Sequence, residues 1–311
     1  MGIFDWGLGP HVENKRTITE TNQETMKTYI QVFLTFARNS LVRDLSFRTN
    51  FLLQCVTSIS WAIMNWAFFK IIFAQGKNIA IGKGTGWTEN EFFIFLGTVW
   101  IINAIVQTFF MPNAQEFSEL IRTGNLDFAL LKPIDTQFLV SFPRMNWASL
   151  ANFFLGVVVV AFYANVLTHE AVNPLSLSVL QVFLYVVFIG AGVVIMYSVM
   201  ISLAATSVWL GRNQNLYMIW FYLTNFYRYP MEIYQRGVIG WGLWGFFSFV
   251  VPVLVVANVP ARTLAQPLRE SGGNRWENWL ILLLFTMALV SLLVSRRVFR
   301  WALSSYRSAS S

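Results

Sequence analysis

The chain has 311 residues, of which 56% are hydrophobic, 17% are aromatic and only 12% are charged. Soluble globular domains carry about 25% charged residues, so this composition excludes an ordinary soluble protein and indicates one that lies in a membrane. The net charge of +7 comes from lysines and arginines at the ends of apolar runs, a pattern that argues against nucleic-acid binding and indicates anionic lipid headgroups.

The first 48 residues are predicted to lie outside the membrane core. Residues 1–22 are polar and lack the apolar core of a secretory signal, so we expect an uncleaved cytosolic tail. Residues 23–48 carry apolar side chains at steps of three and four, which predicts an amphipathic helix. Lys27, Arg38 and Arg43 are interspersed along this helix, so we expect it to lie along the membrane interface.

Residues 49–311 are predicted to form one domain with six transmembrane helices. Apolar runs alternate with polar loops along this part of the chain, and a hydrocarbon core of about 30 Å needs roughly 20 residues per helix. The expected spans are about 49–73, 91–111, 145–167, 177–210, 216–226 and 276–294. The predicted fold class is therefore an all-α polytopic membrane protein.

Residues 112–144 interrupt the apolar runs with a charged segment that is predicted to lie in the cytosol. The stretch NAQEFSELIRT (113–123) is predicted to form a short helix that ends at Gly124. Leu126–Leu131 then offers an apolar surface. From the residues alone, docking of a soluble partner and an amphipathic helix resting on lipid headgroups explain this segment equally well.

Residues 227–268 contain an apolar stretch that is broken by glycines and by Pro252. Its centre, 237–260, is long enough to cross the membrane. Six spans place 14 of the 22 lysines and arginines inside, against 13 for seven spans, so the charge count barely discriminates. Six spans are favoured by three arginines beside a span end, Arg296, Arg297 and Arg300. We therefore expect a re-entrant hairpin on the outer side and both termini in the cytosol.

No group of residues in the sequence is suited to catalysis or metal binding. Cys55 is the single cysteine, and the two histidines, His11 and His169, are predicted on opposite sides of the membrane. The loop GKNIAIGKG (76–84) departs from the phosphate-binding motif in its spacing. Acidic residues avoid the middle of every predicted span, which argues against a proton-driven pump. We therefore expect no catalytic residue, metal or cofactor in this chain.

Arg228, Glu232 and Arg236 recur every four residues, so on a helix they would form a ladder of charges. Such a ladder could be a polar ring at an outer gate, a site for an anionic headgroup, or an ion-paired structural clip. The clip is the preferred interpretation.

The order of these elements, with IRTGNLDFALLKPID at 121–135 and the broken stretch 227–261, resembles the ABC-2 type permeases. These are the membrane subunits of bacterial ATP-binding-cassette exporters, and the resemblance covers nearly the whole chain. It implies a permease that forms the translocation pathway, driven by a separate cytosolic ATPase that binds ATP and magnesium. It also implies a multi-pass protein of the bacterial inner membrane and a second permease subunit, either another copy or a sister permease.

In that family the segment after the second span is a coupling helix that sits in a groove of the ATPase, and the hairpin before the last span caps the pathway. The coupling residues expected on this basis are Glu116, Phe117, Glu119, Leu120, Arg122, Gly124 and Asp127. The expected outer gate, facing the partner permease, is Phe246, Phe247, Phe249, Val251, Pro252 and Val253. The alternative function is a membrane-embedded structural or assembly subunit with no pathway of its own.

Overall fold

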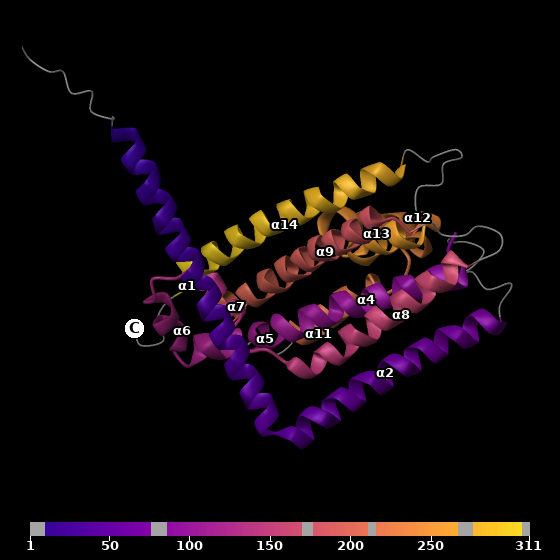
Figure 1. Ribbon diagram of the computed structural model, residues 1–311, viewed down its shortest axis with the longest axis horizontal. Coiled ribbons are helices and arrows are strands. Elements are labelled where there is room, and N and C mark those ends of the chain that lie inside the picture. Colours follow the sequence, from indigo (N-terminus) through magenta and orange to yellow (C-terminus); the bar gives the residue numbers. More distant parts are fainter. Residues whose placement is uncertain (1–9, 76–85, 170–176, 211–215, 267–275, 307–311) are drawn as a thin grey trace, which may run out of the picture.

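The computed structural model describes residues 10–75, 86–169, 177–210, 216–266 and 276–306, and within them every regular element is a helix. Figure 1 shows the main helices lying side by side in one elongated bundle. The α-helices are α1 (Pro10–Ser46), α2 (Arg48–Gln75), α4 (Glu89–Phe109), α5 (Met111–Arg122), α6 (Asn125–Leu130), α7 (Thr136–Ser141), α8 (Leu150–Thr168), α9 (Val179–Ala205), α10 (Ser207–Leu210), α11 (Leu216–Phe226), α12 (Gly237–Gly245), α13 (Leu254–Ala265) and α14 (Trp276–Ser305). Three short turns complete the fold: η1 (Trp147–Ser149), η2 (Met231–Tyr234) and η3 (Phe246–Val250).

Five helical stretches are long and apolar enough to cross a membrane: Arg48–Ala74, Glu89–Arg122, Trp147–Thr168, Val179–Leu210 and Trp279–Ser305. A sixth is obtained if the pair Gly237–Val250 and Leu254–Ala265, bent by 88°, is counted as one span. These findings confirm an all-α polytopic membrane protein.

The predicted span 216–226 is not among these stretches. α11 has 11 residues, which gives a helix of about 16 Å, roughly half the thickness of the hydrocarbon core. The apolar run ends there because Arg228 and Pro230 follow closely.

Local sequence explains where the principal helices begin. Thr88 forms a capping box with Glu91 at the start of α4: its backbone N–H donates to the glutamate at 2.8 Å, and its hydroxyl accepts from the Glu91 N–H. Ser178 and Gln181 form the same arrangement at the start of α9. Both boxes satisfy backbone donors that a helix start leaves unpaired.

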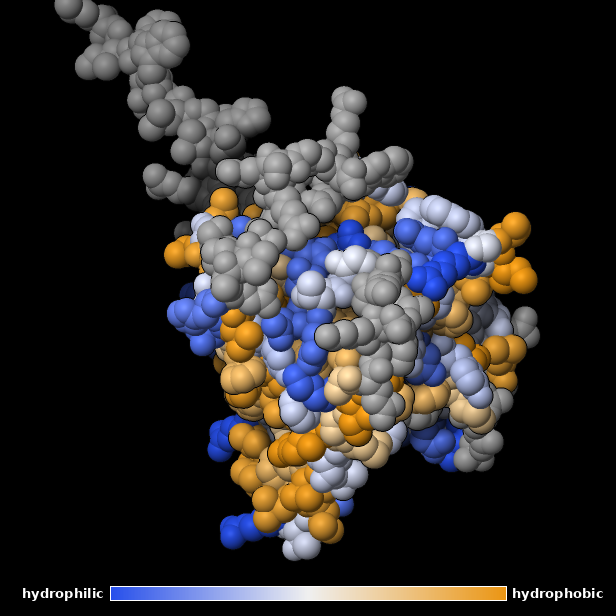
Figure 2. All heavy atoms as spheres, turned by 90° about the vertical axis from the view of Figure 1, so that its right-hand side faces the viewer, coloured by the Kyte–Doolittle hydropathy of each residue, from blue (hydrophilic) through white to orange (hydrophobic). Residues whose placement is uncertain are grey.

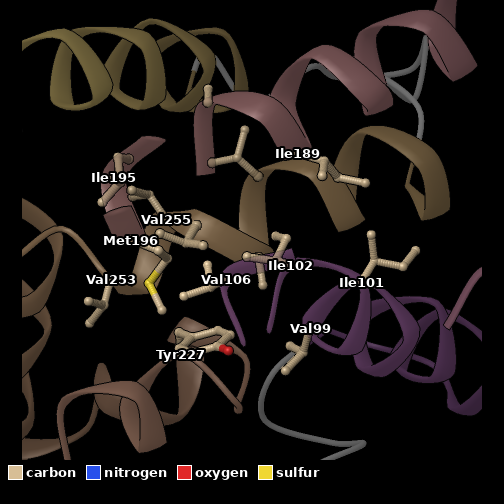
Figure 3. Packing of buried hydrophobic residues seen from close by; sticks show 14 of the residues in the cluster. Val99, Ile101, Ile102, Val106, Ile189, Ile195, Met196, Tyr227, Val253 and Val255 are labelled. Atoms are coloured by element: carbon tan, nitrogen blue, oxygen red, sulfur yellow. The ribbon is translucent and has the colours of Figure 1, made fainter. Parts of the chain in front are cut away.

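The core of the bundle forms where α4 meets α8, α9 and α13. Figure 3 shows apolar side chains from α4, α9 and α13, with Tyr227, packed into one cluster. α13 is a half-length helix whose residues from Leu254 to Ala261 are all buried. Its Asn258 accepts a hydrogen bond from the N–H of Met231 at 3.0 Å. Protein therefore surrounds the broken backbone at Pro252, as it must at membrane depth.

Two glycines allow α4 and α8 to approach closely. A Cβ atom on Gly156 would lie 2.9 Å from the carbonyl oxygen of Gly97 and 2.9 Å from a side-chain carbon of Ile101. Such distances are below van der Waals contact, so even alanine at this position would force the two helices apart.

We expect Gly156→Ala to destabilise the protein by about 1–3 kcal/mol, because overpacking shifts backbone. The matched control is Gly190→Ala on α9, where an added Cβ would meet no atom within 4 Å. Thermal unfolding of the purified variants measures the difference. Equal midpoints for the two variants would contradict this packing.

α1 differs from the expectation for the first 48 residues. The helix begins at Pro10, so the segment predicted as a tail, 1–22, is helical over its described part. Figure 1 shows α1 crossing the end of the bundle at a steep angle to the other helices. Tyr29 packs on Phe138 and Phe33 on Phe142, whereas other apolar side chains of α1 remain exposed, including Met26, Ile30 and Leu34.

The flanks of the bundle are apolar, as lipid contact requires. In the most apolar stretch of α2, 11% of the residues are buried, whereas 72% are buried in the corresponding stretch that contains α4. Figure 2 looks onto the end opposite α1 and shows hydrophilic side chains gathered there, with hydrophobic ones along the edges.

Candidate functional site

The segment after the second span is fixed to the bundle by a buried phenylalanine. α5 follows α4 after a break at Phe110 and has Pro112 in its first turn, where proline is tolerated. Phe117 is 0% exposed, and its ring centroid lies 5.8 Å from that of Phe299 on α14. Phe117 was expected to contact a partner. Its burial means instead that it holds α5 against the last span.

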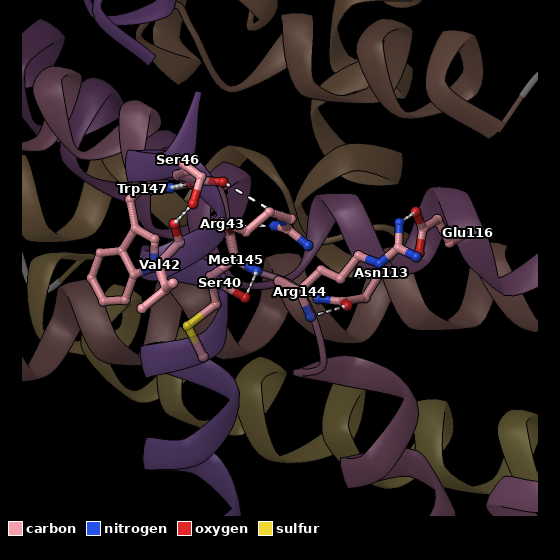
Figure 4. Close-up of polar contacts among 10 residues, drawn as sticks. Ser40, Val42, Arg43, Ser46, Asn113, Glu116, Arg144, Met145 and Trp147 are labelled. Carbon is pink, nitrogen blue, oxygen red and sulfur yellow. Dashed lines mark hydrogen bonds and ion pairs between the residues drawn. The ribbon is translucent and has the colours of Figure 1, made fainter. Parts of the chain in front are cut away.

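Asn113 joins α5 to the chain that follows α7 (Figure 4). Its side-chain nitrogen lies 2.9 Å from the carbonyl oxygens of Phe109 and Ser141 and 2.7 Å from that of Arg144. Its side-chain oxygen accepts from the Arg144 N–H at 2.8 Å. The carboxamide is buried, so these bonds are shielded from water and fix the backbone of both segments.

The charged residues of α5 pair within this part of the chain. Glu116 forms an ion pair with Arg144, and Glu119 with Arg122. Both pairs are solvent-exposed, so neither contributes much to stability. Leu120 is half-buried against the core. Glu116 therefore links α5 to Arg144, whereas Glu119 and Arg122 pair with each other on the same helix.

α6 carries the exposed apolar surface. Gly124 turns the chain with a φ of 72°, a conformation that favours glycine, and places α6 after α5. Leu126 is buried, whereas Phe128 is 67% exposed and Leu131 82% exposed. We call Phe128, Leu130 and Leu131 the α6 knob. Asp127 lies beside it in the first turn of α6.

α1 is tied to both ends of the stretch 135–147. The Tyr29 hydroxyl accepts from the N–H of Asp135 at 3.1 Å. At the other end, Ser40 accepts from the N–H of Met145 at 3.1 Å, as Figure 4 shows. Asp44 accepts from the N–H of Trp147 at 3.1 Å. The interfacial helix and this stretch therefore form one connected unit.

α9 also holds this stretch. The Tyr197 hydroxyl accepts from the Gln137 side chain at 3.0 Å and lies 2.8 Å from the Ser141 hydroxyl. Phe117 packs against α14, and Asn113 joins α5 to the chain that follows α7. A displacement of α6 would therefore be transmitted to α1, α9 and α14 together.

The opposite end of the bundle carries an ion-paired clip, but not the predicted ladder. Arg228, Glu232 and Arg236 lie in a turn, in η2 and just before α12, so they do not share a helix face. Glu232 pairs with Arg262 of α13 and accepts from the Trp87 indole N–H at 2.9 Å. The ladder is wrong because Pro230 and Gly237 interrupt the helix.

Glu232→Gln should destabilise the protein by about 2 kcal/mol, because the Arg262 guanidinium would lose its counter-charge in a partly buried site. The matched control is Glu89→Gln, which breaks an exposed pair with Lys70 and should cost less than about 1 kcal/mol. Thermal unfolding midpoints compare the two variants. A larger loss for the control would refute the clip.

The expected gate residues do not share one face. Pro252 and Val253 are buried within the chain, and Phe247 stacks on Phe226 with centroids 3.9 Å apart. Phe246 and Phe249 are exposed. Val251 is half-buried against the core. Only part of the predicted set can therefore face a partner permease, since α13 is a core element.

Burial near this end changes the pKa of Tyr234. It raises the pKa of Tyr234 to about 12, and the Tyr234 hydroxyl donates to the Phe226 carbonyl at 3.1 Å. The hydroxyl therefore remains protonated near neutral pH and keeps η2 fixed to the end of α11.

Sequence reasoning missed the residues that fasten the segments together: Asn113, Gln137, Ser141, Tyr197 and Arg262. Each of them pairs with a residue far away along the chain, and no local pattern marks such pairs.

The comparisons with known proteins agree with this architecture. The sequence model of a family described as ABC-2 family transporter protein matches residues 59–310. A search of curated proteins and a search of solved structures find no match to the chain. Since the family match covers most of the sequence, the chain belongs to the ABC-2 transporter family and is a permease component of an ABC transporter.

Proposed function

We propose that this permease exports its cargo and is driven by a separate cytosolic ATPase, to which the α6 knob docks. The observation that carries the proposal is the contrast between the knob and its surroundings. Phe128 and Leu131 are exposed at the tip of a segment in which Phe117 and Leu126 are buried. Large exposed apolar side chains on a well-fixed support are typical of protein interfaces.

The anchoring of this segment suits the transmission of force. A partner that closes on the knob moves α6 as a rigid body, because Asn113, Tyr197 and Phe117 connect its support to α9 and α14. A loosely attached loop would bend instead. ATP and magnesium would be bound by the partner, and this chain would supply the docking surface and the pathway.

The distribution of charge supports a cytosolic location for the knob. Among the side chains that the structure describes, ten lysines and arginines belong to the knob end and four to the opposite end. The ten are Lys27, Arg38, Arg43, Arg48, Arg122, Lys132, Arg144, Arg296, Arg297 and Arg300; the four are Lys70, Arg228, Arg236 and Arg262. By the positive-inside rule, this distribution supports the proposal that the knob, α1 and the end of α14 lie on the cytosolic side of a bacterial inner membrane.

Fusion reporters test this orientation. A fluorescent protein fused after Ser311 should fold and fluoresce, whereas a periplasm-dependent phosphatase at the same position should be inactive. The same two reporters inserted within 170–176 should give the opposite result. A phosphatase that is active only at the carboxyl end would refute the orientation.

A second permease subunit completes the proposed pathway, as another copy or a sister permease. Phe246 and Phe249 remain exposed beside the bend and can reach across an interface. Apolar side chains from two subunits can close a narrow constriction by excluding water.

Complex formation and hydrolysis test the proposal. The tagged full chain is isolated from its own cells, and a co-purifying protein with nucleotide-binding motifs is identified and expressed with it. Reconstituted in lipid vesicles, the two should form a stable complex whose ATP hydrolysis changes when the permease is present. A permease that binds no such ATPase, or that leaves hydrolysis unchanged, would instead favour the structural or assembly subunit.

A further inference from the structure

An open groove lies between α2 and the start of α8. It has a volume of about 450 Å³ and is lined by Asn50, Leu53, Gln54, Thr57, Ser58, Asn146, Ala148 and Ser149. Small-molecule sites typically measure about 300–1,000 Å³, so the groove is large enough to hold one. Its α2 side precedes residue 59, where the family match begins.

The groove is polar although one side of it belongs to a candidate membrane span. Asn50, Gln54, Thr57 and Ser58 lie on one face of α2, because steps of three, four, seven or eight residues return to nearly the same side of an α-helix. Residues 50–58 rise about 12 Å along the first part of Arg48–Ala74, a stretch long and apolar enough to cross a membrane. The other exposed side chains around them, including Leu52 and Val56, are apolar and suit lipid.

The carboxamides of the groove have no hydrogen-bond partner within the described parts of the chain. The Thr57 hydroxyl donates to the Leu53 carbonyl of its own helix at 2.7 Å, whereas Asn50, Gln54 and Asn146 make no side-chain bond there. An unpaired carboxamide in hydrocarbon costs several kcal/mol. A polar occupant would satisfy these groups.

Packing keeps the groove open at one end of α2 only. Further along the helix, the Trp66 indole donates to the Tyr163 hydroxyl at 3.0 Å, and the Phe69 ring lies 4.9 Å from that of Phe92. Near the start of α2 no aromatic contact draws the helix onto α8 in the described structure. The Cys55 sulfur makes a weak contact there with the Ala148 carbonyl at 3.9 Å.

We propose that this groove binds the uncharged, hydroxyl-rich headgroup of an amphiphile that enters from the inner leaflet, such as a glycolipid. Three carboxamides and three hydroxyl groups line it, and none of its lining residues is charged. Carboxamides supply both donors and acceptors, which matches hydroxyl groups, whereas an anionic headgroup would be bound better by arginine. The exposed apolar face of α2 would then lie beside the acyl chains. That the groove serves as a substrate or entry site rests on the proposed function.

Lipid binding to the permease without its ATPase tests the inference. The full chain is placed in lipid nanodiscs after purification in a detergent without a sugar headgroup, since a maltoside would compete. Two photoactivatable probes with identical acyl chains are compared: glucosyl diacylglycerol and phosphatidylglycerol. The glycolipid should label peptides containing 50–58 and 146–149, and free methyl glucoside should compete weakly, because it lacks the acyl chains.

The double variant Asn50→Leu/Gln54→Leu should reduce glycolipid labelling about tenfold or more, because each lost hydrogen bond weakens binding several-fold. Both substitutions are more apolar than the original residues and so favour membrane insertion. The matched control Asn65→Leu, on the same helix but outside the groove, should label normally. Equal labelling by the two lipids, or unchanged labelling of the double variant, overturns the inference. Because no ATPase is present, either result leaves the docking proposal untouched.

Discussion

Replacing Phe128 and Leu131 together by serine should abolish stable binding of the ATPase. Each large apolar side chain contributes about 1.5–3 kcal/mol when it is fully buried, so the pair accounts for about 3–6 kcal/mol at an interface. Affinity should therefore fall by roughly two to four powers of ten. Both side chains are exposed in the permease, so the substitutions should leave its own stability and membrane insertion unchanged. Affinity is measured with the complex in nanodiscs.

The matched control is the pair Phe246→Ser and Phe249→Ser, two exposed phenylalanines at the opposite end of the bundle. These variants should bind the ATPase normally. A second comparison reverses the charges of Glu119 and Arg122, which form an exposed pair on α5. If the charge reversal weakens binding while Phe128→Ser/Leu131→Ser has no effect, the docking surface is the charged face of α5 and the knob assignment is wrong.

Asn113→Leu should uncouple the ATPase from the spans without releasing it. The substitution removes the contacts with Ser141 and Arg144 and leaves buried carbonyl groups without a partner, at a cost of about 3 kcal/mol. The knob itself is unaltered, so binding should persist. The readout is nucleotide-dependent labelling of a cysteine placed at Phe249 in a Cys55→Ala background. Labelling should change with ATP in the parent and lose that response in the variant.

The control for this variant is Asn125→Ala. Asn125 is exposed and bonds only to the neighbouring Thr123 hydroxyl at 2.9 Å, so its loss should change neither the thermal midpoint nor the response to ATP. A normal ATP response in Asn113→Leu, with a lowered thermal midpoint, would show that Asn113 has a purely structural role.

The sequence predicts the membrane class and most helices because the membrane imposes a simple rule. Backbone groups must be satisfied within each span, so long apolar runs mark helices reliably. The break at Pro252 is also readable, since proline cannot continue a regular helix. The described part of α11 is apolar, but its 11 residues are too few to cross a membrane by themselves.

The candidate site is predictable only in part. The position of the segment and the apolar stretch Leu126–Leu131 are visible in the sequence, yet α5 and α6 each present both apolar and charged side chains. Burial of Phe117 against Phe299 depends on a helix far away along the chain, which no local pattern reveals. The same limit explains why the predicted charge ladder at Glu232 was wrong, since the partner of Glu232 is Arg262 on α13.

Site-specific crosslinking from the knob tests the central claim most directly. A photoreactive amino acid replaces Phe128 in the full chain, in membranes of the cells that make it, and a second version carries it at Phe246. The account predicts a crosslink from 128 to the cytosolic ATPase, with a yield that changes on adding ATP, and none from 246. If 128 crosslinks only to lipid while the ATPase still co-purifies, the knob rests on headgroups and the coupling account is contradicted.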